Sequence, residues 1–183
     1  MRKEIIIIGP LPPPYYGQSL GFFSLKEELT KEYFVYFINI QPKFSKPGVG
    51  FNFIRVIEYI FSFLQLFFFL YKSNKDCKVY ITVAQSSSGF YRDFLFILIS
   101  SLFSRKIFAH LKGGNFENFY KKSNFISKYL IKFVYKKVFK IIILGNLLKN
   151  NFNFSKTVKN KIVIVENGLT NDDVPFKKKN NPK

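Results

Sequence analysis

The chain has 183 residues, of which 48% are hydrophobic, with one cysteine, one histidine and a formal net charge of +18. This length fits a single domain with its own core, and one cysteine excludes a disulfide framework and a cysteine-based zinc site, so we expect a cytoplasmic protein. The charge favours an anionic partner. Because the chain is also apolar and holds no nucleic-acid-binding motif, a lipid surface is favoured over nucleic acid.

Apolar runs alternate with helical periodicity along the sequence. We expect six short strands, at residues 5–8, 34–40, 78–83, 105–109, 140–144 and 161–165. Helices are expected from Ser19 onward and over residues 51–71, 91–103 and 125–138. Strands that are apolar on both faces and alternate with helices indicate a parallel sheet. The predicted fold is α/β, a Rossmann-like sheet with helices on both faces, in one domain of residues 1–170 before a linker or disordered basic tail, 171–183.

The loop from Pro10 to Ser19 joins the first strand to the first helix. Four prolines stiffen it, and Gly17 lets a ligand approach the backbone. Ser19 is predicted as the helix N-cap, beside free N–H groups that suit an anion. Since the loop matches neither a dinucleotide fingerprint nor a phosphate loop, a purely structural role stays open.

The predicted helix over residues 51–71 is almost wholly apolar. Its polar residues form one thin stripe at steps of three or four: Asn52, Arg55, Glu58, Ser62 and Gln65. Such a helix is buried on most sides or faces something other than water, so a core helix and a helix partly embedded in a lipid surface both stay open. We do not expect it to span a bilayer, because its charge-free stretch is about 13 residues against roughly 20 needed.

Lysines recur on the predicted helix over residues 125–138. Lys128, Lys132 and Lys136 are four residues apart and therefore share one face. We expect that face to lie opposite the apolar residues at helical spacing, which are Ile126, Tyr129, Leu130, Phe133, Val134 and Val138. Exposure of this face to water would explain the run of lysines. Docking to an anionic membrane surface would explain it too, since each lysine near charged lipid contributes about 1 kcal/mol.

His110 follows the apolar run of residues 105–109 and precedes a glycine pair. We expect it at the carboxyl end of the fourth strand, where ligands collect in open α/β sheets, with a structural role as the alternative. Arg92 follows a serine-rich loop and either binds a phosphate or carboxylate or pairs with Asp93. No cluster of His, Cys, Asp or Glu has the spacing of a metal site.

Four segments carry a resemblance to a known family. They are Pro10 to Ser19, Gln85 to Asp93, Phe108 to Phe116, and Val163 to Leu169. In this order they resemble the N-terminal domain of glycosyltransferases of the GT-B fold, family 4. The resemblance covers the chain up to Leu169, and its histidine-containing segment is the most specific part. It implies the acceptor-side half of a two-domain enzyme, whose C-terminal donor-binding domain is missing here.

The resemblance also implies roles for single residues. His110 would face the donor sugar and help to stabilise an oxocarbenium-like transition state. Donor or acceptor contacts would come from Gly17, Gln18, Arg92, Gly113, Gly114 and Asn115. Gln18 stands where the family usually has a second glycine, and Glu166 stands where a proline is common.

The activity implied by the resemblance is transfer of a sugar, with retention, from a nucleotide-sugar donor to a lipid-linked or saccharide acceptor. Such transfer serves cell-surface polysaccharide or glycolipid synthesis at the inner face of the membrane. The resemblance implies no permanently bound cofactor and no activity without the C-terminal domain. The alternative, from a different class, is a stand-alone, non-catalytic binding or scaffold domain at the membrane, as a split or truncated subunit.

Overall fold

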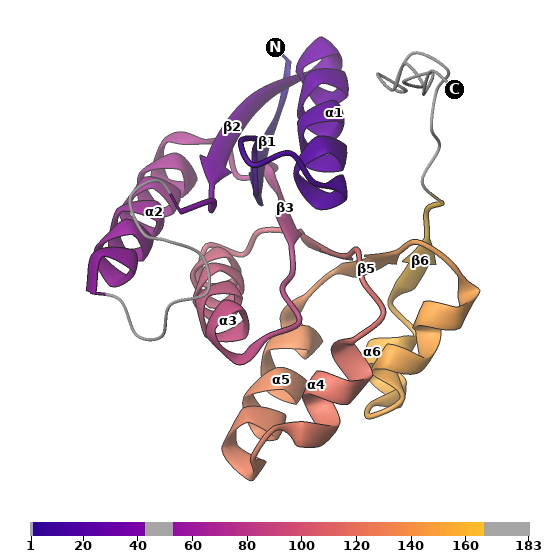
Figure 1. Ribbon diagram of the computed structural model, residues 1–183. Helices are drawn as coiled ribbons and strands as arrows, with labels where there is room; N and C mark the ends of the chain where they lie inside the picture. Colours follow the sequence, from indigo (N-terminus) through magenta and orange to yellow (C-terminus); the bar gives the residue numbers. More distant parts are fainter. Residues whose placement is uncertain (1, 43–52, 167–183) are drawn as a thin grey trace, which may run out of the picture.

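The structure is a computed structural model that describes residues 2–42 and 53–166. Its strands are β1 Lys3–Gly9, β2 Tyr33–Asn39, β3 Lys78–Thr82, β4 Ile107–Leu111, β5 Lys140–Ile143 and β6 Ile162–Ile164. All pair in parallel in one six-stranded sheet of order β2-β1-β3-β4-β5-β6 (Figure 1). The predicted Rossmann-like α/β architecture is confirmed. The predicted tail, 171–183, lies outside the described residues.

Helices cover both faces of the sheet. The longer ones are α1 Gly17–Glu32, α2 Phe53–Lys72, α3 Ser87–Leu102 and α5 Phe125–Lys137. Shorter pieces are α4 Phe116–Lys122, the 3-10 helix η1 Asn146–Phe152 and α6 Lys156–Lys159. Helix α1 lies on one face of the sheet, and the later helices pack on the other (Figure 1).

The first strand supplies both core layers. Side chains alternate across a strand, so Ile6 and Ile8 join the larger core under α2, α3 and α5, whereas Ile5 and Ile7 pack with Phe22 of α1. All four isoleucines are buried. A continuous β-branched run is therefore what a strand covered on both faces requires.

The strand order reverses at β1. From β1 the chain moves outward to β2 and then returns to β3 on the other side of β1. The connections after β1 and β3 therefore leave the sheet in different directions, which opens a crevice at the carboxyl ends of these strands. This is the edge at which a ligand site is expected.

Several boundaries differ from the prediction, and that of β4 bears on the site. Strand β4 begins at Ile107, two residues later than predicted, so His110 lies within the strand and pairs with Thr82 of β3. Arg105 precedes the strand, and its buried guanidinium donates hydrogen bonds to the carbonyl of Leu70, at 2.7 Å, and to other carbonyls that follow it. Pairing with neighbouring strands, and not the apolar run itself, sets where β4 begins.

The prediction of Ser19 as the N-cap of the first helix is wrong. Helix α1 begins at Gly17 with Tyr16 as its N-cap. The backbone N–H of Tyr16 donates to Oγ of Ser19 at 3.1 Å, and that hydroxyl donates to the carbonyl of Pro14 at 2.8 Å. Ser19 thus holds the end of the proline-rich loop against the first helical turn.

Candidate functional site

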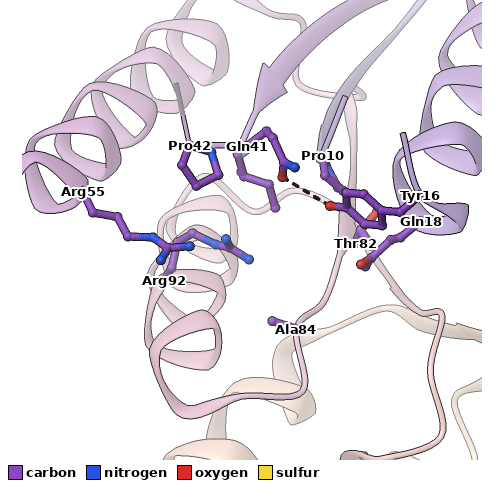
Figure 2. A pocket seen from close by; sticks show the side chains of 10 residues that line it. Pro10, Tyr16, Gln18, Gln41, Pro42, Arg55, Thr82, Ala84 and Arg92 are labelled. Atoms are coloured by element: carbon purple, nitrogen blue, oxygen red, sulfur yellow. Dashed lines mark hydrogen bonds between the residues drawn. The ribbon is translucent and has the colours of Figure 1, made fainter. Parts of the chain in front are cut away.

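Two cavities lie at the carboxyl edge of the sheet. The first, which we call the arginine pocket, has about 200 Å³ and is lined by Pro10, Tyr16, Gln18, Ile40, Gln41, Pro42, Arg55, Thr82, Ala84 and Arg92 (Figure 2). The second, the glycine pocket, has about 300 Å³ and is lined by Gly17, Gln18, Gln85, Lys112, Gly113 and Leu144. Gln18 lines both, so the two cavities adjoin across the start of α1.

In the arginine pocket, Arg92 pairs with Asp93, which is one of the two alternatives left by the sequence, and ligand binding by Arg92 stays a prediction. Its Nε and Nη2 donate to one carboxylate oxygen of Asp93, at 2.9 Å and 2.7 Å, while the side chain still lines the cavity. The other carboxylate oxygen of Asp93 accepts the N–H of Ala84 at 2.7 Å. Burial raises the pKa of Asp93, and the Arg92 charge and the Ala84 N–H oppose that rise. The pair therefore fixes the connection between β3 and α3.

A second arginine reaches the same pocket from α2. Nε of Arg55 donates to the hydroxyl of Tyr59 at 3.0 Å. The guanidinium carbons of Arg55 and Arg92 lie 6.0 Å and 5.7 Å from the centre of the Tyr59 ring. Figure 2 shows the two side chains converging on one side of the cavity. None of the residues that line it is acidic, so its field is positive.

The glycine pocket is built on the start of α1. Gly17 and Gln18 are the first two residues of this helix, and the N–H groups of a first helical turn have no acceptor within the helix. They carry the positive end of the helix dipole. Gly17 has open space where a side chain would stand. The predicted residues Gly17, Gln18 and Gly113 are thus brought together, although they come from distant parts of the chain.

Lys112 is a functional candidate that sequence reasoning missed. It lines the glycine pocket, and its Nζ lies only 2.9 Å from the point that a side chain on Gly21 of α1 would occupy. Burial lowers the pKa of this lysine. The signal was available, because Lys112 directly follows β4, at the carboxyl edge of the sheet where ligands collect.

His110 is buried and lines neither cavity. Its Nδ1 lies 2.5 Å from the hydroxyl of Tyr80, and its Nε2 has no hydrogen-bond partner among the described residues. Burial, and next the positive charge of Lys112, lower the pKa of His110 to about 4. Burial raises the pKa of Tyr80, so its hydroxyl stays protonated. With that hydroxyl donating to Nδ1, the neutral ring carries its proton on Nε2.

Gly114 and Asn115 lie just beyond the glycine pocket and do not line it. The N–H of Asn115 donates to the side-chain oxygen of Gln85 at 2.5 Å, and Asn115 is the N-cap of α4. Gly114 faces Leu148, whose methyl group would lie 3.5 Å from a side chain placed there. These residues hold the loop after β4 against the loop after β3.

Helix α2 turns its apolar side outward. The large side chains that it exposes are Phe53, Ile54, Ile57, Ile60, Phe61, Leu64, Phe67, Phe68 and Tyr71. Among the described residues it is the one helix long and apolar enough to cross a membrane, and only 11% of its most apolar stretch is buried. The interpretation as a core helix is therefore wrong for most of its surface. Within the polar stripe, Arg55, Glu58 and Ser62 are half-buried, Gln65 is exposed and Asn52 lies outside the described residues; Arg55 reaches the pocket.

Helix α5 also differs from the prediction. Leu130, Val134 and Val138 face the core, but the other members of the predicted apolar stripe, Ile126, Tyr129 and Phe133, are exposed. Lys132 and Lys136 are exposed with them, whereas Lys128 is half-buried and lies 5.8 Å from the centre of the Tyr120 ring. Aromatic and cationic side chains therefore share the outer face of α5 instead of occupying opposite faces.

No protein-family model matches the sequence, and no curated protein matches it. The function is therefore argued from the site. Within residues 2–42 and 53–166, no three His, Cys, Asp or Glu side chains gather in a group that could hold a metal ion. The two pockets instead present guanidinium, ammonium and helix N–H groups, which suit anionic ligands.

Proposed function

We propose that this chain is the acceptor-side half of a retaining, nucleotide-sugar-dependent glycosyltransferase that acts on a membrane-borne acceptor. The main support is the convergence of the segments that carry the resemblance to family 4 of the GT-B fold. The loop before α1, the loop before α3 and the loop after β4 all line the same carboxyl edge of the sheet. The fourth segment follows β6 and in part lies outside the described residues.

The glycine pocket suits the diphosphate of a nucleotide-sugar. The start of α1 offers helix N–H groups, and Lys112 adds a cation at the same cavity. Gly17 leaves room for the ligand beside the backbone, whereas the Gln85 side chain fills the space beside Gly113. The remaining donor contacts would come from a C-terminal domain facing this edge. Family resemblance is the only argument for that domain.

In this proposal His110 acts as a hydrogen-bond donor. Its neutral ring carries a proton on Nε2, which has no partner among the described residues, and it lies close enough to Lys112 to be affected by that charge. A neutral donor suits a sugar hydroxyl, which it would orient for transfer. Because Nε2 is buried and His110 lines neither cavity, the family resemblance alone supports this positioning role.

The outward apolar face of α2 supports a membrane-borne acceptor. An exposed patch of this extent on a soluble protein marks an interaction surface. The helix packs inward through Leu66 and Leu70, so in this fold it would lie in the membrane surface and could not span it. The aromatic and lysine side chains on the outer face of α5 suit the same anionic surface. The arginine pocket would then open beside the lipid.

Vesicle flotation tests the membrane part. The double substitution Phe61→Gln and Phe68→Gln on α2 should lower partitioning onto anionic vesicles at least about tenfold, because two large side chains lose their burial in lipid. The matched control is Phe34→Gln with Leu147→Gln, at similarly exposed positions off α2. Equal binding by both double variants, or no binding by the native chain, would contradict membrane docking through α2.

Turnover tests the enzymatic part. The chain would be assayed together with its donor-binding domain, with labelled nucleotide-sugars and membranes as acceptor. We expect His110→Gln to lower kcat/KM more than about tenfold, a loss above about 1.4 kcal/mol of transition-state stabilisation. An unchanged rate would exclude the positioning role of His110. A chain that binds membranes but forms no active pair with any donor-binding domain would instead be a scaffold.

A further inference from the structure

The arginine pocket has two arginines but one ion pair between described residues, that of Arg92 with Asp93. Among the described residues, Asp93 is the one carboxylate that pairs with either arginine there. Nε and Nη2 of Arg92 donate hydrogen bonds to Asp93, and Nε of Arg55 donates one to the Tyr59 hydroxyl. Arg92 also has a side-chain hydrogen bond with Tyr59, whereas neither terminal nitrogen of Arg55 has a hydrogen bond with a described residue. The guanidinium of Arg55 thus offers two nitrogens to a ligand.

The surroundings of these nitrogens suit an oxyanion. Thr82 lines the same cavity, is 1% exposed, and its Oγ1 has no hydrogen-bond partner among the described residues. Tyr16 and Gln41 close the opposite side through a hydrogen bond of 3.2 Å between their side chains (Figure 2). Thr82 lies near Tyr16, across the cavity from the two arginines (Figure 2), and its buried hydroxyl gives a ligand one more hydrogen-bonding group.

We propose that the arginine pocket binds a phosphate group carried by the acceptor lipid. A phosphate offers several oxygens in a tetrahedral arrangement, which matches donors that approach from two different helices better than a planar carboxylate does. Arg55 also places the site at the lipid boundary, since it projects from the inner side of the helix whose outer side is apolar. The acceptor would thus be anchored by its phosphate beside the membrane surface.

This inference rests on the proposed function, because it takes the pocket to be part of the acceptor site. Its test does not depend on sugar transfer. Inorganic phosphate would be titrated into the 183-residue chain, with binding followed by calorimetry and with acetate as the carboxylate comparison. We expect saturable binding of phosphate at least about fivefold tighter than that of acetate.

Arg55→Gln is the decisive variant, because Arg55 has no carboxylate partner among the described residues whose charge would be left buried. It should weaken phosphate binding at least about fivefold. Lys72→Gln is the matched control, since it removes one charge from the same helix about 25 Å further along. If the first variant fails to fold, Arg55→Lys keeps the charge but not the fork and should still weaken binding. Equal effects of Arg55→Gln and Lys72→Gln would overturn the site.

A second arm distinguishes the source of the phosphate. Neutral phosphatidylcholine vesicles with a minor fraction of phosphatidic acid would be compared with vesicles that carry the same charge as a fatty acid. We expect Arg55→Gln to reduce binding to the phosphatidic acid vesicles only. Dependence on Arg55 toward inorganic phosphate but not toward phosphatidic acid would overturn the lipid source. A chain that binds phosphate through Arg55 but transfers no sugar in the complete enzyme would contradict the proposed function and leave the phosphate site standing.

Discussion

Because His110 is neutral in the folded protein, we expect the free energy of unfolding to depend on pH. The folded pKa is about 4, whereas an unfolded histidine has a pKa of about 6.5. As the pH falls from about 6.5 towards 4, His110 binds a proton in the unfolded chain but stays neutral in the folded chain. The stabilisation is therefore complete above the unfolded pKa and is lost at lower pH. Linkage between the two pKa values gives a loss of about 2 kcal/mol by pH 5.

The measurement is urea unfolding of the native chain and of His110→Gln at a series of pH values from about 7.5 to 5. Carboxylates such as Asp93 titrate in both proteins, so the difference between the two free energies of unfolding isolates the histidine. That difference should change by about 2 kcal/mol across the series. A change below about 0.5 kcal/mol would refute the burial of a neutral ring. Because the chain has one histidine, its ring protons also give a single NMR titration, expected near pH 4.

Further predictions concern packing at the two ends of the sheet. Arg105→Met should lower the free energy of unfolding by about 2–4 kcal/mol, because it leaves the carbonyls at the end of α2 without donors. A loss below about 1 kcal/mol in urea unfolding would contradict that role. Gly9→Ala should cost about 1–3 kcal/mol, since the added carbon would lie 2.4 Å from the ring of Phe22. Gly145→Ala, with nothing within 4 Å of the added carbon, is the control and should leave the thermal midpoint almost unchanged.

The sheet was predictable because its physical signal is local. Each strand is a short apolar run, and a run such as Ile5–Ile8 that feeds two core layers has no polar side. Helices between the runs then require parallel pairing. The position of His110 within β4 was not predictable in the same way. It depends on hydrogen-bond pairing with β3 and β5, which is a contact between segments far apart in sequence.

The candidate site was predictable only in part. Gly17, Gln18, Gly113 and Arg92 line the two pockets, since each stands in the loop or the first helical turns that follow a strand. Arg55 was not identified as a site residue, because it stands in the polar stripe of a predicted helix and not in a loop after a strand. Its role depends on which side of α2 faces the protein. Periodicity shows how side chains are distributed around a helix, but it does not show which side meets the sheet.

The orientation of α2 links the fold to its proposed use. A rotation of this helix about its axis would bury the phenylalanines against β2 and α3, which is the arrangement that water favours. It would also withdraw Arg55 and Tyr59 from the arginine pocket and leave Arg92 with Asp93 alone. The observed orientation keeps the pocket and leaves nine large apolar side chains exposed. An apolar environment outside the chain reconciles both features. In the proposed function, the orientation that completes the pocket would also place it at the edge of a lipid surface, where an acceptor with a phosphate and an apolar tail would meet both.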